Sequence, residues 1–516
     1  MITMSTPEQI LKQTFGFDTF RPLQREVIQH VLDRRDTLAV MPTGGGKSLC
    51  YQIPALTFAG LTVVVSPLIA LMKDQVEQMH ALGIPALFLN SSLSAPDYRK
   101  GMAAVRDGSA RLLLVAPETL MLPHILDLLA ARGVDFFVID EAHCISEWGH
   151  DFRPEYRQLA DVRKRFPSAV CLALTATATA RVRGDITASL GFPESNTVVA
   201  SFNRPNLFIE VEAKHRATEQ IDAFLQRYRD QSGIVYCFSR KQVETLSAWL
   251  NGRGYRALPY HAGLDDDARR SNQEAFIRDN VQIMVATIAF GMGINKPNVR
   301  FVIHHDLPKS IENYYQEIGR AGRDGLPAHC LLLYGYGDVM KLRHFIEQKT
   351  GDERAVAEQH LKAITRYAEG VTACRRRPLL AYFGETFGEA NCGGCDVCQG
   401  EPAVRQDITI PAQKLLSCVH RTGERFGVAH VVDVLLGSDN EKVRQHGHQQ
   451  LSTYGIGKEL DAGQWRDLAA QLIASGHLEQ EEEYRSLRLT SKARADLRAR
   501  APIHGVLRPP AAVSSS

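Results

Sequence analysis

Two series of short, continuously apolar runs, separated by longer helical patterns, set the strongest limit on how this chain can fold. The first series comprises residues 37–40, 61–65, 112–115, 136–139 and 170–174. The second follows Asn203-Arg204-Pro205 and comprises residues 234–238, 257–260, 283–286, 301–304 and 330–333. Continuous apolar runs, which do not alternate with polar residues, are typical of strands that helices cover on both faces. The pattern therefore predicts two parallel-sheet α/β domains in tandem, with a linker near Arg204-Pro205.

The composition is that of an ordinary globular protein. The chain has 516 residues, of which 44% are hydrophobic and 23% charged. At about 150 residues per domain, this length predicts about three to four domains that each bury a core. These fractions exclude a disordered, a collagen-like and a disulfide-dense chain. The formal net charge of +2 gives no sign of nucleic-acid binding, so any basic surface must be local and balanced by acidic surface elsewhere.

No segment has the pattern of a secretory signal or of a membrane span. Residues 1–16 lack a continuous apolar stretch, because Glu8 and Lys12 interrupt it. The most apolar stretch, residues 61–72, is too short to cross a bilayer and is broken by Ser66-Pro67. We therefore expect an intracellular protein with no membrane partner, whose cysteines are thiols or metal ligands and not disulfides.

Beyond about residue 336 the pattern changes. Charged helical sequence leads to a segment rich in Cys and Gly at 391–398, and helical spacing resumes after Pro402. Residues 508–516 are rich in Pro, Ala and Ser, which is typical of a disordered tail. The predicted boundaries are 1–205 and 206–340 for the two α/β domains, 341–406 for the Cys-rich module, 407–502 for a C-terminal domain and 503–516 for a disordered tail.

The segment Thr43-Gly44-Gly45-Gly46-Lys47-Ser48 follows the first predicted strand and opens a helix. In such a loop the glycines let backbone N–H groups surround a phosphate, the lysine neutralises the β and γ oxygens, and the serine hydroxyl ligates Mg²⁺. Met41 stands where the usual P-loop pattern has its first glycine. The strand before the segment, the helix after it and the intact Gly-Lys-Ser core favour a phosphate site over a chance glycine-rich turn.

Asp140-Glu141-Ala142-His143 comes directly after the predicted strand 136–139. Strand ends in parallel sheets face the ligand crevice, so both carboxylates are expected beside the phosphates. Asp140 is suited to hold Mg²⁺ through water, and Glu141 to orient or deprotonate the attacking water. An Asp-Glu pair after a strand is by itself most often a helix cap, but downstream of a P-loop the catalytic interpretation is favoured.

Four cysteines have the spacing of a metal site. Cys374 precedes Cys392-Gly393-Gly394-Cys395-Asp396-Val397-Cys398, in which two glycines permit tight turns. Four thiolates suit a tetrahedral site, and the spacing is compatible with structural zinc or with an iron–sulfur cluster. The remaining cysteines are scattered and are expected to be buried thiols: Cys50, Cys144, Cys171, Cys237, Cys330 and Cys418.

Together, several segments resemble those of the superfamily 2 helicases. These are residues 44–48, 140–143, 175–177 and 316–323. Phe20-Arg21-Pro22-Leu23-Gln24 before the P-loop and residues 148–154 after Asp-Glu-Ala-His narrow the resemblance to the RecQ DNA helicases. The motifs occur in order and cover the chain from Phe15 to about Thr490. The resemblance implies an α/β fold with two tandem RecA-like parallel-sheet domains, followed by a zinc-binding helical module and a winged helix.

In that family the segment before the P-loop holds adenine. The resemblance implies that the Gln24 amide pairs with the adenine edge, while Arg21 and the Phe17 ring enclose its face. The family commonly has Tyr where Phe17 stands, so stacking is retained and a phenolic hydrogen bond is not. A core aromatic is the alternative interpretation of Phe17.

Arg320 and Arg323 are expected on one face of a helix, because they are three residues apart. The resemblance implies that they belong to the second domain and reach the γ-phosphate when the two domains close. Such an arginine finger contributes roughly 10³–10⁵ in rate. With Lys47, Asp140 and Glu141, they complete the expected catalytic set.

The resemblance also implies contacts with DNA. Trp148 and Phe152, in an aromatic-rich loop with His143 and Arg153, offer faces for base stacking, although aromatics at this spacing are more often core residues. Thr175-Ala176-Thr177 would link the ATP site to DNA movement. Further residues that match motifs contacting the DNA strand are Ser239, His261, Gly291 and Asn295.

For residues 408–500 the resemblance implies a winged helix that grips duplex phosphate. Its recognition helix would include residues 453–459 or their neighbours, and residues 478–489 would form the wing hairpin. The hairpin tip would be acidic through Glu479 and Glu481 to Glu483, so it either acts as a wedge between strands or does not touch DNA. Many family members carry a further helical nucleic-acid-binding domain, so either this chain lacks one or it has been cut at a linker near Pro509-Pro510.

The combined expectation is an ATP- and Mg²⁺-dependent DNA helicase in which Cys374, Cys392, Cys395 and Cys398 hold Zn²⁺. The resemblance implies 3′→5′ translocation on single-stranded DNA and unwinding of duplex DNA in recombination and repair. It further implies a monomer in the bacterial cytoplasm, associated with the nucleoid, with single-strand-binding protein and topoisomerase as partners. The alternatives are an RNA helicase with the same motor and a non-enzymatic zinc/winged-helix regulator, against which the intact motor residues argue.

Overall fold

The computed structural model describes residues 6–149, 151–291, 296–370, 373–400, 406–481 and 486–507. The chain forms two compact units. The first comprises residues 1–370 and 374–396, and the second comprises residues 371–373 and 397–516. None of the helices in the described ranges is long and apolar enough to span a membrane.

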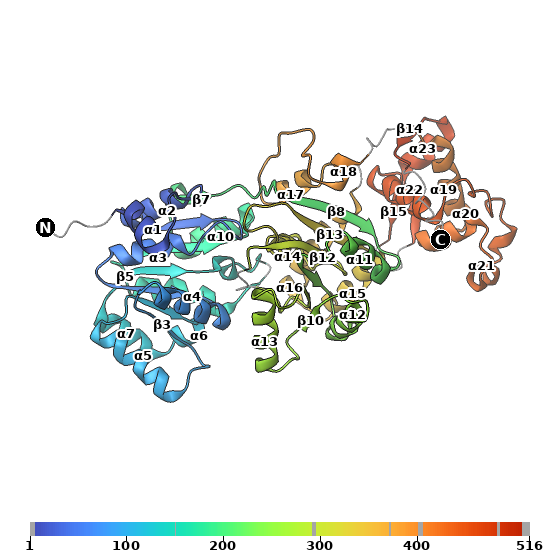
Figure 1. Ribbon diagram of the computed structural model, residues 1–516. Helices are drawn as coiled ribbons and strands as arrows, with labels where there is room; N and C mark the ends of the chain where they lie inside the picture. The colour runs from blue at the N-terminus through green and yellow to red at the C-terminus, as the bar shows by residue number, and fades with distance from the viewer. Residues whose placement is uncertain are drawn as a thin grey trace. The chain divides into compact units, whose positions relative to one another are not determined.

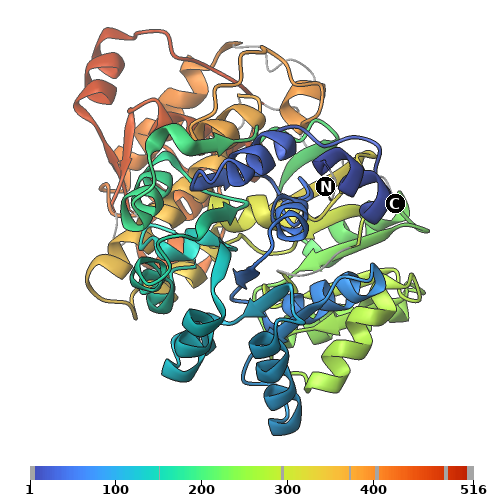
Figure 2. The same cartoon turned by 90° about the vertical axis from the view of Figure 1, so that its left-hand side faces the viewer.

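The first unit begins with a seven-stranded sheet whose paired strands are all parallel, in the order β3-β4-β2-β5-β6-β1-β7. Every position of β1, β2, β4 and β6 is buried, because helices cover both faces of the sheet (Figures 1 and 2). The strands are β1 (Thr37–Val40), β2 (Leu61–Val65), β3 (Ala86–Leu89), β4 (Leu112–Val115), β5 (Val134–Ile139), β6 (Val170–Thr175) and β7 (Thr197–Val199).

Capping residues in the sequence define the ends of several helices around this sheet. In α1 the Thr6 hydroxyl accepts a hydrogen bond from the Gln9 N–H, and the Gln9 side chain accepts one from the Thr6 N–H at 2.8 Å. Gly16 then ends α1 in the left-handed region, at φ +74°. The helices are α1 (Pro7–Phe15), α2 (Gln24–Leu32), α3 (Leu49–Thr57), α4 (Ile69–Ala81), α5 (Ala95–Asp107), α6 (Pro117–Leu120), α7 (Pro123–Arg132), α8 (Pro154–Arg157), α9 (Leu159–Lys164) and α10 (Ala180–Leu190), with 3-10 turns η1 (Ala142–Ile145) and η2 (Glu194–Asn196).

A second sheet of six strands follows in the same unit, again with parallel pairings, in the order β10-β11-β9-β12-β13-β8. The prediction of two tandem parallel α/β domains is therefore confirmed. The strands are β8 (Leu207–Ala213), β9 (Ser232–Tyr236), β10 (Ala257–Tyr260), β11 (Ile283–Ala286), β12 (Val299–His304) and β13 (Ala328–Tyr334). The helices are α11 (Ala217–Gln226), α12 (Arg240–Gly252), α13 (Asp266–Ile277), α14 (Ile311–Ile318) and α15 (Tyr336–Ile346).

The strands and one helix of these two domains differ in part from the sequence prediction. The predicted strand sets omitted β3, β7 and β8, which are all edge strands of their sheets. The predicted helix carrying Arg320 and Arg323 was also too long, because α14 ends at Ile318. The two arginines lie on the turn that follows, where Gly322 adopts φ +56°, so they do not share a helix face.

The Cys-rich segment joins a helical module that packs on the second sheet. Its helices are α16 (Gly351–Glu369), α17 (Arg376–Tyr382) and α18 (Asp396–Gln399). The Arg375 side chain is almost fully buried and donates to both carboxylate oxygens of Asp396, at 2.9 Å from Nε and 2.9 Å from Nη2. The Ile209 N–H of β8 donates to the Gly394 carbonyl at 3.1 Å, which fixes the Cys-rich turn to the sheet edge.

The second unit is helical and has its own core around Trp465, which is fully buried. Its indole N–H donates to the Gly457 carbonyl at 2.7 Å. The expected wing hairpin is present, because β15 and β16 pair antiparallel with Leu478 opposite Leu489. The elements are α19 (Thr409–Arg421), α20 (Val428–Leu436), α21 (Glu441–Gln445), η3 (His448–Gln450), α22 (Ala462–Ala474), β15 (Leu478–Gln480), β16 (Leu487–Leu489) and α23 (Ser491–Ala499), with β14 (Gln406–Asp407) paired to β17 (His504–Gly505).

Two details of this unit correct the sequence prediction, and a third concerns the acidic hairpin. Residues 453–459 form turns and no helix, so a recognition helix can lie only in the neighbouring elements, of which α22 is the longest. Residues 503–507, expected to be disordered, are bonded into the unit: Val506 N–H donates to the Gln471 side chain at 2.9 Å. At the acidic hairpin, Glu481 accepts from Arg488 at 2.9 Å, which neutralises part of the charge, whereas Glu482 and Glu483 lie outside the described residues.

Candidate active site and nucleic-acid interface

The P-loop connects β1 to α3 and is shaped by its glycines. Gly44 and Gly46 adopt left-handed backbone conformations, at φ +84° and +78°. A Cβ on Gly45 would lie 2.9 Å from the Pro42 carbonyl oxygen, so only glycine fits there. Lys47 Nζ donates to the Met41 carbonyl at 3.3 Å, which folds its ammonium back over the loop. The backbone thus has the strained, open turn that a phosphate-binding loop requires.

The segment expected to hold adenine lies directly on the P-loop. Gln24 is almost fully buried, and its Nε2 donates to the Gly46 carbonyl at 2.9 Å. The Arg21 guanidinium donates to the Gly44 carbonyl. The Phe17 ring is 53% exposed, which argues against a core role and leaves its face open to a ligand. The Gln24 amide would have to leave the P-loop carbonyls before it could pair with a base.

The two acidic residues follow β5, at the carboxyl edge that also carries the P-loop. Burial and the neighbouring Glu141 raise the pKa of Asp140 to about 7, while Lys47 opposes the shift. A cation bound at this point would restore the ionised form of Asp140, so the environment fits Mg²⁺ held by Asp140 and Ser48. Glu141 is a non-glycine residue at φ +50°, which is a strained conformation of the kind that concentrates at functional sites.

A glutamine that the sequence analysis did not single out supports the P-loop serine. The Gln75 side chain in α4 donates to the Ser48 hydroxyl at 3.1 Å and accepts a hydrogen bond from the Tyr51 hydroxyl. Because Gln75 occupies one lone pair of the Ser48 oxygen, it orients the other lone pair. This amide has no sequence motif around it, and only the packing of α4 against α3 reveals it.

Arginines from the second half of the unit complete the nucleotide site. A Cβ on Gly44 would lie 3.4 Å from Cγ of Arg323, which places Arg323 against the P-loop. Burial and the charges of Arg320 and Arg204 lower the pKa of Arg323 to about 9. This crowding of positive charge favours an anionic ligand such as a triphosphate.

Arg204, which the sequence placed only in a linker, connects the two halves of the site. Its guanidinium donates to the Thr43 carbonyl at 3.1 Å and to the Ala321 and Gly322 carbonyls at 3.1 and 2.9 Å. The P-loop and the turn with Arg323 are therefore held by one side chain. Arg320 is buried close enough to Arg323 to help lower its pKa, and its guanidinium donates to the Gly291 carbonyl.

His143 does not lie on a DNA-facing surface, because its side chain is fully buried. Its Nδ1 is 2.9 Å from the Thr175 hydroxyl and 3.3 Å from Glu141 Oε2. Thr177 then accepts a hydrogen bond from Gln316 Nε2 of α14, at 3.2 Å. A chain of contacts thus runs from the carboxylates after β5 to the second sheet.

The aromatic residues after His143 lie at or near the surface. Trp148 is half-buried, and the Arg181 guanidinium lies 3.1 Å from its ring centroid. The Phe152 ring lies 5.7 Å from the guanidinium of Arg157. Arg153 pairs with Asp151 at 3.1 Å. Trp148, Phe152 and Arg153 are all partly exposed, and none of them belongs to the large buried side chains of the first sheet.

The candidate DNA-contacting residues of the second sheet lie on the loops after its strands. Ser239 is exposed and caps α12 by accepting from the Gln242 N–H at 3.3 Å. His261 is buried, with Nε2 2.8 Å from Glu244. Gly291 is buried, and a Cβ there would lie 2.9 Å from the Ile288 carbonyl oxygen. Asn295 lies outside the described residues.

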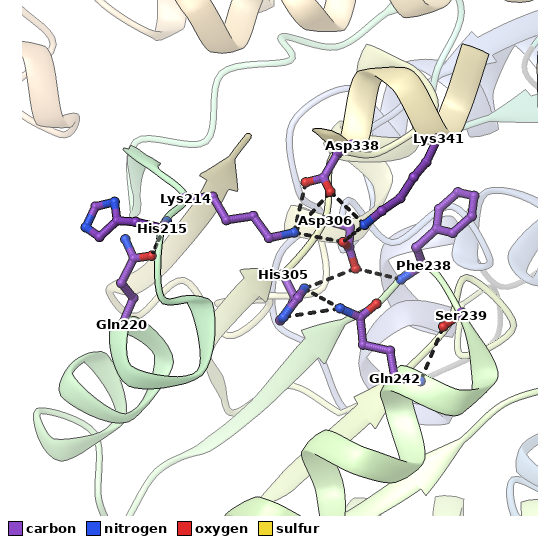
Figure 3. A network of polar contacts seen from close by, with 10 residues as sticks. All are labelled: Lys214, His215, Gln220, Phe238, Ser239, Gln242, His305, Asp306, Asp338 and Lys341. Carbon is purple, nitrogen blue, oxygen red and sulfur yellow. Dashed lines mark hydrogen bonds and ion pairs between the residues drawn. The ribbon is translucent and has the colours of Figure 1, made fainter. Parts of the chain in front are cut away.

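A buried ionic network fixes the loop that carries Ser239 (Figure 3). Asp306 Oδ2 accepts from the Phe238 N–H at 3.0 Å, and Oδ1 accepts from Lys214 Nζ at 2.8 Å. Lys214 also donates to Asp338 of α15, at 3.0 Å. Burial opposes ionisation, but the hydrogen bond from His305 and the charge of Lys214 hold the pKa of Asp306 well below its usual value. The network joins β8, β12 and α15 behind Ser239.

The four cysteines predicted to bind metal come together. The Sγ atoms of Cys374, Cys392, Cys395 and Cys398 all lie within 4.8 Å of one another. Zinc–sulfur bonds of about 2.3 Å in a tetrahedron would place the sulfurs at a compatible spacing. Four thiolates leave no position for a reacting water, so the residues fit Zn²⁺ in a structural role.

Family comparisons agree with this geometry. The DEAD/DEAH box helicase family matches residues 21–185, and the helicase conserved C-terminal domain matches residues 216–325. The RecQ zinc-binding domain matches residues 336–399, and the RQC domain matches residues 402–511. The order of the four matches follows the two sheets, the Cys-rich module and the second unit.

Similar proteins extend over nearly the whole chain. The ATP-dependent DNA helicase RecQ of Pasteurella multocida is 46% identical over 501 residues, covering 96% of this chain and 79% of that protein. The Bacillus subtilis protein of the same name is 42% identical, covering 94% and 83%. Among solved structures, the helicase MrfA bound to DNA covers 95% of this chain and 60% of that chain, with a TM-score of 0.55 and 16% identity, a likeness of fold alone. The chain belongs to the RecQ family of ATP-dependent DNA helicases.

Proposed function

We propose that this helicase moves 3′→5′ along single-stranded DNA and unwinds duplexes in recombination and repair. The observation that carries the mechanism is the position of Arg204, which bonds both the P-loop and the turn with Arg323. A nucleotide bound there is contacted from both halves of the unit. Hydrolysis would remove the contact with the γ-phosphate, and the two sheets could then move relative to each other.

The residue roles follow from the site. Bound Mg²⁺ would neutralise charge on the β and γ phosphates. Glu141 orients and deprotonates the attacking water, and Arg323 stabilises charge on the γ-phosphate. The proposed catalytic residues are Lys47, Asp140, Glu141, Arg320 and Arg323, and the proposed nucleotide-binding residues are Phe17, Arg21, Gln24, Thr43, Gly44, Gly45, Gly46, Lys47 and Ser48, with Ser48 and Asp140 as Mg²⁺ ligands.

For DNA we propose contacts on both halves of the first unit. Trp148 and Phe152 would stack with bases, while Arg153, Ser239 and the loop at Gly291 would meet the strand backbone. We keep Asn295 in this set. His143 and His261 are both buried, so we assign them supporting roles. His143 belongs to the chain of contacts from Glu141 to Gln316, which we call the coupling path, and His261, paired with Glu244, supports the loop after β10.

The finer biological setting is also a proposal. We propose domains over 1–205, 206–340, 341–406 and 407–507, the last extended because residues 503–507 bond to α22. The chain would act as a monomer at the nucleoid in the bacterial cytoplasm, since the relatives above are bacterial. Single-strand-binding protein and topoisomerase are the proposed partners.

Strand displacement tests the proposed polarity. Forked, 3′-tailed and 5′-tailed DNA duplexes and matching RNA duplexes are incubated with and without ATP across a salt series. We expect unwinding of the forked and 3′-tailed DNA only with ATP, and weaker binding as salt rises, because phosphate contacts release counterions. Unwinding of the 5′-tailed duplex alone would refute the polarity, and unwinding of RNA alone would favour the RNA helicase alternative.

The Lys47→Ala variant tests the motor assignment. We expect loss of DNA-stimulated ATP hydrolysis, because the ammonium over the P-loop would no longer neutralise the phosphates. Lys164→Ala is the matched control, since Lys164 is exposed and pairs with Asp161 at 2.8 Å. Full ATP hydrolysis by Lys47→Ala would show that the motor site has been assigned wrongly.

A further inference from the structure

The contact between Arg181 and Trp148 is unusually close. The guanidinium carbon lies 3.1 Å from the ring centroid, whereas every other cation–ring contact among the described residues is 4.3 Å or longer. Arg181 is exposed, and in the described part of the chain no carboxylate pairs with it. The guanidinium therefore covers one face of the indole, and this contact is a cation–π interaction.

Arg181 connects the Trp148 loop to the segment that follows β6. It lies in the first turn of α10, whose N-terminus is capped by the Thr179 hydroxyl accepting from the Val182 N–H at 3.4 Å. At the other end of the same loop, His143 contacts the Thr175 hydroxyl at 2.9 Å. Both ends of residues 143–148 are thus attached to residues 175–181, one in the interior and one at the surface.

The loop between these two attachments is tightly folded. The Ser146 N–H donates to the His143 carbonyl at 3.2 Å, and the Gly149 N–H donates to the Ser146 carbonyl at 3.0 Å. A Cβ on Gly149 would lie 2.5 Å from the His143 carbonyl oxygen, so only glycine lets the backbone approach this closely. The two turn hydrogen bonds join Trp148 to His143, and the Arg181 guanidinium joins Trp148 to the start of α10.

Residues 175–181 lead in turn to the second sheet. Thr177 accepts from Gln316 Nε2 of α14 at 3.2 Å, and the Thr175 hydroxyl donates to the Thr177 carbonyl at 3.2 Å. A displacement at Arg181 thus has a short covalent and hydrogen-bonded route to the contact between the two sheets. This route does not pass through the P-loop.

We propose that Arg181 is a positioning residue through which occupancy of Trp148 by DNA is transmitted to the ATP site. The proposal rests on the proposed function of Trp148 as a stacking surface. A base that stacks on the covered face displaces the guanidinium, which then pairs with a phosphate of the same strand. The start of α10 follows, and with it the Thr177–Gln316 contact.

The first test distinguishes a loss of DNA-stimulated ATP hydrolysis from a loss of DNA binding. We expect Arg181→Ala to keep DNA-free ATP hydrolysis within about twofold, because Arg181 does not touch the nucleotide site. Its affinity for single-stranded DNA should change by no more than about two- to fivefold, the worth of one exposed cation–ring contact. Maximal DNA-stimulated hydrolysis should fall at least about fivefold. Arg181→Lys should recover part of this loss, since an ammonium also binds an aromatic face.

Arg253→Ala is the matched control. The Arg253 guanidinium lies 4.9 Å from the Trp249 ring centroid on α12, away from the coupling path. We expect this variant to leave DNA stimulation unchanged. Equal loss of stimulation in both variants would show that removing any surface arginine weakens the motor, and it would overturn the proposal.

Fluorescence of a single tryptophan gives a second readout. The chain has three tryptophans, so Trp249→Phe with Trp465→Phe leaves Trp148 as the only indole. We expect acrylamide quenching of Trp148 to rise in Arg181→Ala without DNA, and wild-type emission to change on adding DNA. If emission does not respond to DNA, the stacking role of Trp148 fails and the proposal with it. If emission responds but Arg181→Ala retains full stimulation, the stacking role stands and the proposal is wrong.

Discussion

At the scale of single residues, the nucleotide site depends on a side chain that carries no motif. Arg204 precedes a proline in a linker, and nothing in its spacing distinguishes it from a surface arginine. In the structure its guanidinium reaches carbonyls on both the P-loop and the turn after α14. Burial lowers its pKa, so its charge is held in a poorly solvated position where backbone carbonyls replace water.

We predict that Arg204→Ala lowers the kcat of DNA-stimulated ATP hydrolysis at least about tenfold, or about 1.4 kcal/mol in the barrier. The reason is that the variant lacks the guanidinium that donates hydrogen bonds both to the P-loop and to the turn with Arg323, so the two are no longer held together. Arg204→Lys should restore only part of the rate, because one ammonium cannot replace the planar fork of donors. Steady-state hydrolysis at saturating DNA measures the effect. Arg256→Ala, which removes an exposed donor to the Asn280 carbonyl, is the control, and full activity in Arg204→Lys would contradict the prediction.

Sequence patterns predicted the P-loop and the carboxylates, because these residues belong to contiguous motifs after strands. They could not predict Gln75 or Arg204, whose partners are distant in sequence. The same limit applies to His143: the sequence grouped it with the aromatic-rich loop of Trp148 and Phe152, whereas its side chain is buried and contacts Thr175. A motif identifies which residues take part, but the packing decides which of them face a ligand.

At the scale of elements, the strands that the sequence missed share a physical cause. A central strand is covered on both faces and flanked on both sides, so its run of apolar residues is continuous. The edge strand β8 instead alternates buried and half-buried residues, and β7 has one fully buried position among three. Edge strands carry weaker signals, because one side of each remains open. The single edge strand that was predicted, β10, is buried only at Ala257.

In the second unit, α20 packs on η3 through two histidines. His430 Nε2 lies 2.8 Å from His448 Nδ1, and the His430 ring stacks on Phe426 with centroids 4.2 Å apart. Burial, together with the charges of His448, Lys442 and His446, lowers the pKa of His430 from 6.5 to about 4. The neutral imidazole is therefore part of the packing between these elements.

We predict that this contact makes the second unit less stable in acid. The unfolded chain binds the proton more readily than the folded one, so the contribution is fully present above about pH 6.5 and is lost as the pH falls toward about 4. The slope is at most about 1.4 kcal/mol per pH unit. Urea unfolding followed by Trp465 fluorescence, with Trp148→Phe and Trp249→Phe, measures it. His430→Phe keeps the stack and should flatten the slope between pH 7 and 5, and an unchanged slope would show that other groups are responsible.

At the scale of the whole molecule, total charge conceals local charge. The chain has 60 basic and 58 acidic side chains, yet Arg21, Arg204 and Arg323 gather around one loop. A near-neutral total is compatible with a phosphate site, because acidic residues elsewhere balance it. The net charge does not indicate how binding at one sheet affects the other, because that depends on a few contacts between the two.

The contact between Thr177 and Gln316 is the most direct of these. Both side chains are buried, and the amide lies 3.2 Å from the hydroxyl. If this bond transmits DNA binding to hydrolysis, Thr177→Val and Gln316→Leu should each lower DNA-stimulated kcat about fivefold, the worth of about 1 kcal/mol. The double variant should be no slower than the worse single variant, because both changes remove one interaction.

A second cycle makes this last prediction specific. Thr187→Val in α10 also removes a buried hydroxyl, one that donates to the Arg183 carbonyl at 3.0 Å and does not touch the second sheet. Combined with Gln316→Leu, it should give effects on kcat that multiply, since the two sites share no partner. If the effects of Thr177→Val and Gln316→Leu on kcat also multiply, the hydrogen bond between these residues does not couple DNA binding to hydrolysis. Other side chains that bond both halves, such as Arg204 and Tyr315, would then be the candidates for the route between the sheets.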